Sequence, residues 1–130
     1  MLLQVVATGL LASVVSPVSA ETYAITLLQA LDKVTARVIT LQAPVGETVR
    51  FGTLEIRAAV CEKRPPEETP DSAAFLDIVE KRAGQAPVEV FRGWMFASSP
   101  GLSPMQHPVY DLWVVDCVSS LPSAAPGGSP

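Results

Sequence analysis

The residue types best suited to nucleophilic chemistry fall in one stretch near the C-terminal end of the chain. It contains Ser98 and Ser99, the single histidine His107, and Asp111 four residues further on. A serine activated by a histidine that an acid orients is typical of acyl-transfer hydrolases. The serines precede Pro100, however, and the G-x-S-x-G turn that usually presents such a serine is absent from the sequence. We therefore predict no catalytic residues and keep a secreted Ser-His-Asp hydrolase as the alternative function.

Other kinds of chemistry find less support in the composition. One histidine and two cysteines are too few for a zinc finger or an iron–sulfur centre. The acids are scattered along the chain rather than paired as glycoside hydrolysis requires. A net charge of −4 supplies no basic surface for nucleic acid. We therefore predict no metal, no cofactor and no nucleic-acid partner.

The first twenty residues have the pattern of a cleavable signal peptide. They carry no charge, and the apolar run over residues 2–15 is short for a membrane span of about 30 Å. Small side chains at Val18 and Ala20 suit a signal peptidase that cuts after Ala20. The alternative is a retained anchor. We predict export to the periplasm, a mature chain that starts at Glu21, and no transmembrane segment after the signal is removed.

Export changes how the two cysteines are interpreted. In an oxidising compartment an even pair is a candidate disulfide. Cys61 and Cys117 would close a loop worth roughly 4 kcal/mol in the chain-entropy model. The alternative is two buried free thiols. We predict the Cys61–Cys117 bridge.

Between the signal and the tail the chain predicts short strands. Residues 54–60 alternate apolar and polar side chains, which is typical of a strand with one buried face. Residues 25–41 fit either a helical stripe or two strands that turn near Asp32 and Lys33, and their β-branched content favours the strands. Further strands are predicted at 75–79, 88–94, 109–117 and 49–51, the last closed by Gly52. The expected fold is all-β: a small antiparallel β-sandwich or partly open barrel of about six or seven strands.

Two segments are not expected to join the core, which we place in a single domain over residues 21–118. Residues 63–72 contain three prolines among acids and predict an exposed proline-rich loop. Residues 119–130 consist mostly of Ser, Pro, Ala and Gly and predict a disordered tail.

Half of the aromatic side chains lie close together in sequence: Trp94, Phe96, Tyr110 and Trp113. They either pack the core of the last two strands or form a partner-binding patch. We predict that Trp94 is largely buried and that the loop over residues 98–107 faces the partner. The candidate binding residues are Ser98, Ser99, Met105, Gln106, His107 and Tyr110.

Several motifs together resemble one known family. They are Ala30 to Val38, Ala43 to Glu47, Phe51 to Leu54, Cys61 with the proline-rich loop, Ala74 to Leu76, Gly93 to Pro100, and His107 to Asp111 with Trp113 and Cys117. The chain resembles, over residues 27–117, the small exported alphaproteobacterial proteins of domain of unknown function (DUF) family 2155. It departs from many members at Gln106, where they carry an acid.

The resemblance implies no established activity, cofactor or catalytic residue. The family's gene often lies beside one for a respiratory complex I accessory or assembly factor, which suggests a partner. We therefore expect a non-catalytic periplasmic binding or assembly module that acts on an envelope protein or membrane complex.

Overall fold

The computed structural model describes residues 3–4, 7–11, 21–65, 69 and 71–120. Over these residues the chain forms eight strands and no helix. The strands are β1 (Glu21–Thr22), β2 (Ile25–Asp32), β3 (Arg37–Pro44), β4 (Thr48–Phe51), β5 (Leu54–Lys63), β6 (Ser72–Glu80), β7 (Val88–Phe96) and β8 (Tyr110–Val118). Much of the predicted signal segment, the middle of the proline-rich loop and residues 121–130 of the predicted tail lie outside the described residues.

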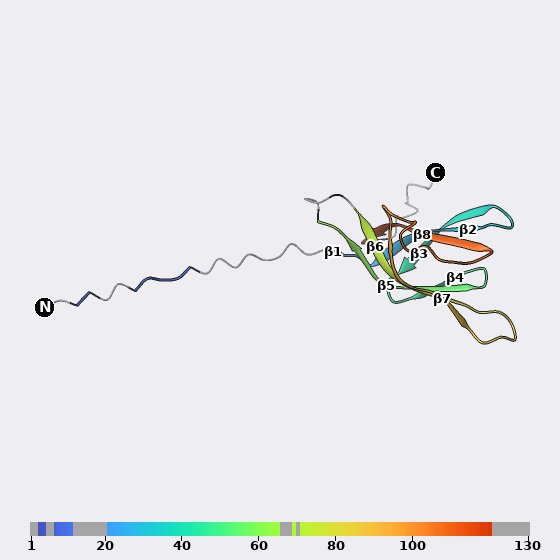
Figure 1. Cartoon of the computed structure of the whole chain (residues 1–130), viewed down its shortest axis with the longest axis horizontal. Coiled ribbons are helices and arrows are strands. Elements are labelled where there is room, and N and C mark those ends of the chain that lie inside the picture. The colour runs from blue at the N-terminus through green and yellow to red at the C-terminus, as the bar shows by residue number, and fades with distance from the viewer. Residues whose placement is uncertain (1–2, 5–6, 12–20, 66–68, 70, 121–130) are drawn as a thin grey trace.

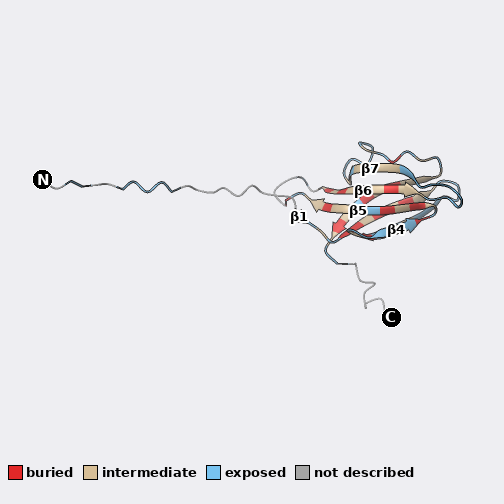
Figure 2. Ribbon diagram, turned by 90° about the horizontal axis from the view of Figure 1, so that it is seen from below, coloured by how far each residue is buried: buried red, intermediate tan, exposed pale blue. Residues whose placement is uncertain are grey.

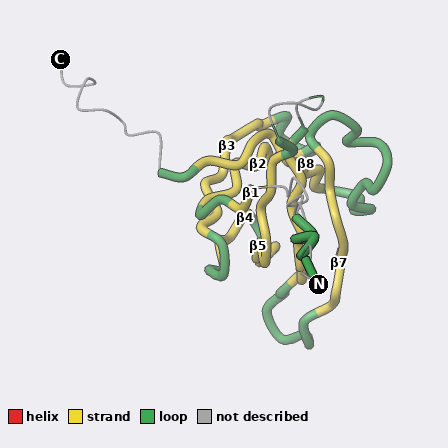
Figure 3. Tube along the Cα trace, turned by 90° about the vertical axis from the view of Figure 1, so that its left-hand side faces the viewer, coloured by secondary structure: helices red, strands yellow, loops and turns green. Residues whose placement is uncertain are grey.

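The strands form two antiparallel sheets (Figure 1). Sheet A has the order β1-β5-β6-β7 with β4 also paired to β5, and sheet B has the order β3-β2-β8. Figure 2 shows β7, β6, β5 and β4 side by side, and β7 ends sheet A at one side of the molecule (Figure 3). The sheets do not close into a barrel, so the all-β sandwich prediction is confirmed, with the two-residue β1 among its eight strands.

The ambiguous segment over residues 25–41 forms the β2–β3 hairpin. Eight residue pairs join the two strands, from Ile25 with Pro44 to Asp32 with Arg37. The side chain of Asp32 accepts the N–H groups of Val34 and Thr35 and so holds the turn. The two-strand interpretation is thus confirmed. The segment forms strands because its β-branched side chains pack well on a pleated surface, and the aspartate stabilises the turn locally.

The predicted hairpin at Gly52 is also present. Phe51 pairs with Leu54, which leaves Gly52 and Thr53 as a two-residue turn. Gly52 has a φ of 58°, in the left-handed region that glycine adopts without strain. A Cβ at this position would also collide with the hydroxyl of Tyr110. Glycine is therefore required both by the turn and by the ring that covers it.

The core lies between the sheets, where alternate residues of each strand point inward (Figure 2). Leu28 of β2, Leu76 of β6 and Leu112 of β8 are among the buried side chains that meet there. Burial of each such side chain contributes about 1.5–3 kcal/mol to the stability of the fold.

The disulfide connects the two sheets across this core. Cys61 of β5 and Cys117 of β8 are bonded, with their Cα atoms 5.7 Å apart. Both residues are almost fully buried, with exposed fractions of 1% and 0%. The predicted bridge is confirmed, and it links sheet A to the last strand of sheet B.

Candidate functional site

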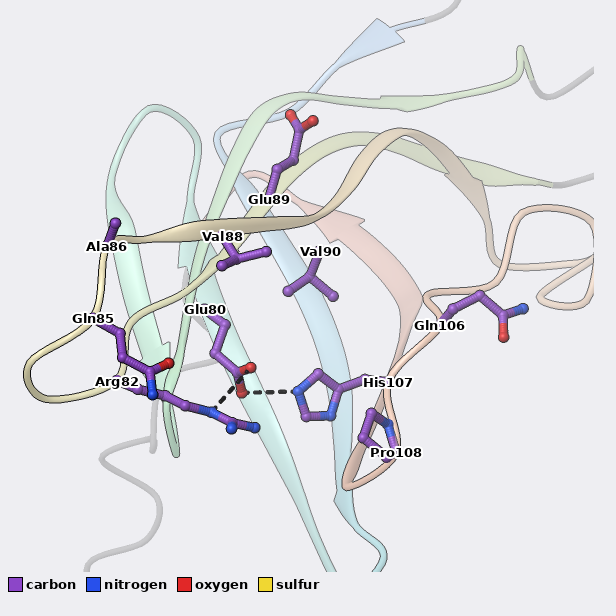
Figure 4. A pocket seen from close by; sticks show the side chains of 10 residues that line it. All are labelled: Glu80, Arg82, Gln85, Ala86, Val88, Glu89, Val90, Gln106, His107 and Pro108. Atoms are coloured by element: carbon purple, nitrogen blue, oxygen red, sulfur yellow. Dashed lines mark hydrogen bonds and ion pairs between the residues drawn. The ribbon is translucent and has the colours of Figure 1, made fainter.

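A cleft of about 400 Å³ opens between the β6–β7 turn and the end of the β7–β8 loop. Glu80 and Arg82 come from the end of β6 and the turn that follows it, and His107 comes from the loop. Figure 4 shows Val88 and Val90 facing these polar groups across the cleft. The volume lies within the usual range of small-ligand sites. Because the cleft also contains the single histidine of the chain, we take it as the candidate functional site.

Both ring nitrogens of His107 are engaged within the fold. Nδ1 accepts the N–H groups of Val109 and Tyr110 at 3.0 and 3.1 Å, and Nε2 lies 2.8 Å from Oε2 of Glu80. A nitrogen that accepts two amide N–H groups carries no proton of its own, so the proton resides on Nε2 and is donated to Glu80. The His107 side chain is only 5% exposed. This geometry anchors the end of the loop and leaves no ring nitrogen free to act as a base.

Glu80 is the centre of the polar network. It accepts the hydroxyl of Thr53 at 2.7 Å as well as Nε2 of His107, and Nε of Arg82 lies 3.3 Å from its other oxygen. The hydrogen bond from Thr53 is the main influence on the pKa of Glu80 and lowers it; burial opposes this, and the hydrogen bond from His107 lowers it further. The pKa of Glu80 therefore lies below its ordinary value, which suits a structural anion rather than a general acid.

We expect Glu80→Gln to lower stability at neutral pH and to remove part of the acid sensitivity of the fold. Because folding lowers the pKa of Glu80, its carboxylate stabilises the fold above the ordinary value of 4.5. This contribution is lost as the pH falls through the lowered folded pKa. Urea unfolding should therefore show a difference between wild type and variant that is largest near about pH 7 and narrows below about pH 4.

The exposed Glu47 in the β3–β4 turn provides the control for this prediction, and Glu47→Gln should leave the pH profile unchanged. A difference for Glu80→Gln that persists undiminished in acid would contradict a role for the ionised carboxylate.

Asp111, the acid of the hydrolase alternative, has a local role. Its Oδ1 accepts the N–H of Leu112 at 2.9 Å. Tyr110 is capped in a similar way by His107. The side chains of Asp111 and His107 thus each accept a backbone N–H of β8. Within the described residues, no hydrogen bond joins Asp111 to His107.

The structure does not bring the serines to the histidine. The N–H of Ser98 donates to Oδ1 of Asp71, just before β6 begins, and Ser99 follows in the same turn after β7. His107 contacts Glu80, the last residue of β6. The nine-residue strand β6 separates these two positions by roughly 25 Å. The Ser-His-Asp alternative is therefore not supported, because loop residues close in sequence are held at opposite ends of one strand.

The predicted binding loop is only partly exposed. Ser98, Ser99 and Gln106 are exposed, and Figure 4 shows Gln106 pointing away from the cleft. Met105 is 5% exposed and belongs to the core, so the prediction that it faces a partner is wrong. Tyr110 also packs inward, against Phe51 with the ring centroids 5.3 Å apart. A loop has no periodicity, so the sequence could not reveal which of its side chains fills the space between the sheets.

The four aromatic residues near the C-terminal end do not form one patch. Trp94 and Phe96 lie on the outer face of sheet A, Trp113 lies on the outer face of sheet B, and Tyr110 points inward. Trp94 is 37% exposed, so the prediction that it is largely buried is wrong. The register shifts between Ile78 and Val79, which places a bulge in β7. The bulge adds one residue to β7 and so reverses the alternation of its side chains. Residues an even number of positions apart therefore face opposite sides of the sheet when the bulge lies between them.

Among the described residues, no group of three or more His, Cys, Asp or Glu side chains could hold a metal ion. In the same part of the chain, we find no helix with the length and hydropathy needed to cross a membrane.

The chain is thus a small, disulfide-linked antiparallel β-sandwich whose single histidine anchors a loop. The chain belongs to the family described as an uncharacterized protein conserved in bacteria (DUF2155), whose model matches residues 26–117. It is similar to an uncharacterized protein of Rickettsia prowazekii (strain Madrid E), with 33% identity over 88 residues, or 68% of this chain and 57% of the relative. The chain thus spans somewhat more than half the length of that relative. No solved structure matches it.

Proposed function

We propose that this protein is a non-catalytic binding or assembly module of the bacterial periplasm. The observation that carries the proposal is an aromatic row on the outer face of sheet A, which consists of Phe75 and Trp94 at paired register positions, with the aliphatic Val60 paired to Phe75 on its other side. Trp94 is partly exposed and packs edge-on against Phe75, with ring centroids 5.7 Å apart. Tryptophans in such positions supply a large contact area at low entropic cost and are frequent hot spots of protein interfaces.

Charged side chains border the aromatic row. Two residues further along β6, on the same outer face, Asp77 lies between Arg57 of β5 and Arg92 of β7. Both arginines are exposed. An apolar centre beside a polar rim is the usual composition of a protein-binding surface. This arrangement supports a protein partner rather than a small molecule at sheet A.

Two observations support the periplasm as the compartment. The buried Cys61–Cys117 bridge is of the kind that persists in oxidising environments. Residues 1–20 are uncharged, and cleavage after Ala20 would leave β1 intact because that strand begins at Glu21. We propose an envelope protein or membrane complex as the partner. The gene neighbourhood of the family makes respiratory complex I the first complex to test.

We expect Trp94→Ala to abolish recovery of the partner while it lowers the free energy of unfolding by only about 1 kcal/mol. The tagged full chain is purified from the periplasm, its start at Glu21 is checked by intact mass, and detergent-solubilised envelope is passed over it. Bound proteins, including complex I subunits, are quantified by mass spectrometry.

Trp113→Ala is the matched control, because it removes the other tryptophan from the outer face of sheet B. It should retain partner recovery. Equal recovery by wild type and Trp94→Ala would place the binding surface elsewhere, and the exposed side chains of Ser98, Ser99 and Gln106 would be substituted next.

A further inference from the structure

Strand β3 forms one edge of sheet B, and many of its side chains are exposed. Along β3, Val38, Thr40 and Gln42 are exposed, and Ile39 and Leu41 are half-buried against the core. The strand has no bulge in its pairing with β2, no lysine, and no proline before its last residue. Long regular edges of this kind readily pair with another strand.

The hydrogen-bond pattern shows which backbone groups of β3 face outward. At one end of the β2–β3 ladder, the N–H of Val45 donates to the carbonyl of Ala24 at 2.8 Å, so these two residues form a hydrogen-bonded pair. At the other end, Lys33 N–H donates to Val109 of the loop before β8, so Asp32 directs its backbone toward β3. Hydrogen-bonded and non-hydrogen-bonded pairs alternate along an antiparallel ladder. Counting from either end therefore assigns the same residues of β3 to the hydrogen-bonded pairs. The N–H and C=O groups of Val38, Thr40 and Gln42 therefore point away from the sheet.

The opposite edge of sheet B is protected by side chains. In β8 the N–H of Tyr110 donates to His107, that of Leu112 to the Asp111 carboxylate, and that of Cys117 to the carboxylate of the residue before it. The edge of sheet A at β7 is interrupted by its bulge. Within the described residues, the outward groups of β3 have no such capping partner.

We propose that β3 pairs antiparallel with β3 of a second copy of this chain, about a twofold axis at Thr40. The two three-stranded sheets would then form one six-stranded sheet. The proposal is independent of the aromatic row on sheet A, because it concerns the other sheet and a backbone edge.

The sequence of β3 is complementary to itself in this register. Thr40 of one copy faces Thr40 of the other, and Ile39 faces Leu41 on the inner side. Threonine and aliphatic cross-strand pairs of this kind stabilise antiparallel sheets. Arg37, the single charged residue of β3, faces Ala43 of the other copy, so the two arginines are kept apart. Arg50 of β4 lines the same hollow of the surface as Arg37, and it is already paired with Glu55 at 2.7 Å.

Light scattering of the full chain purified from the periplasm, over a series of concentrations, should show the mass of a dimer. Thr40→Lys places two like charges at the axis, and Thr40→Pro removes an N–H that is unused within one copy; both should give the monomer mass with the circular dichroism of the wild type. Thr35→Lys at the exposed tip of the β2–β3 hairpin is the matched control and should stay dimeric. A wild type that is monomeric at every concentration, or a dimer that persists in folded Thr40→Lys, would overturn the proposal.

Amide hydrogen exchange provides a second and independent readout. The N–H groups of Val38, Thr40 and Gln42 should exchange slowly only at concentrations where the dimer forms. Those of Ile39 and Leu41 donate within the β2–β3 ladder and should be slow at all concentrations, so they serve as internal controls. A dimer in which the three outward amides exchange as fast as in the monomer would also overturn the proposal, because the interface would then lie elsewhere.

Discussion

Replacing both Cys61 and Cys117 with alanine should lower the free energy of unfolding by roughly 4 kcal/mol. The bridge spans 56 residues and joins β5 of sheet A to β8 of sheet B. Without it, the unfolded chain regains the entropy that closure of this long loop had removed. The loss is a large part of the total of about 5–15 kcal/mol that holds a domain of ordinary stability together.

The measurement is urea unfolding of wild type and double variant, each with and without reductant. Reductant should destabilise the wild type and have no effect on the double variant. Because both sulfurs are buried, native wild type should resist reductant until it unfolds. Identical unfolding midpoints for oxidised and reduced wild type would contradict a stabilising role for the bridge.

Truncation of Met105 should be the most damaging single change in the β7–β8 loop. Met105 is 5% exposed and packs into the core, whereas Leu102 in the same loop is 70% exposed. Met105→Ala leaves a cavity between the sheets and should cost about 2–5 kcal/mol. Leu102→Ala should change the free energy of unfolding by less than about 0.5 kcal/mol.

Urea unfolding of the two alanine variants tests this difference, and Met105→Leu tests its cause. Leucine nearly conserves the buried volume, so it should restore all but about 1.5 kcal/mol or less. Equal stability of Met105→Ala and Leu102→Ala would mean that the loop does not fill the core, and would return Met105 to the exposed surface.

Much of the local structure could be predicted because it depends on neighbouring residues. The alternation over residues 54–60 predicts β5, and the β-branched segment with its aspartate turn predicts the β2–β3 hairpin. The pairing of Cys61 with Cys117 followed from their number and the expected compartment. All of these features can be predicted without information on which strands are neighbours in the sheets.

The site depended on contacts that no local pattern encodes. His107 meets Glu80, 27 residues away, only because the loop after β7 returns along the length of β6. The same return separates His107 from Ser98, although they are close in sequence. A serine, a histidine and an acid in one stretch therefore predicted a constellation that the fold does not form.

The fold class, the hairpins, the disulfide and the family resemblance could all be predicted from the order of the residues. Which side chains are exposed became known from the packed strands: Trp94 is exposed, Met105 is buried, and the capped edge of β8 contrasts with the open edge of β3. This is because an alternating pattern divides the side chains of a strand between two faces without indicating which face is buried. A single bulge reverses that choice, and the burial of a loop residue is decided by strands distant in sequence.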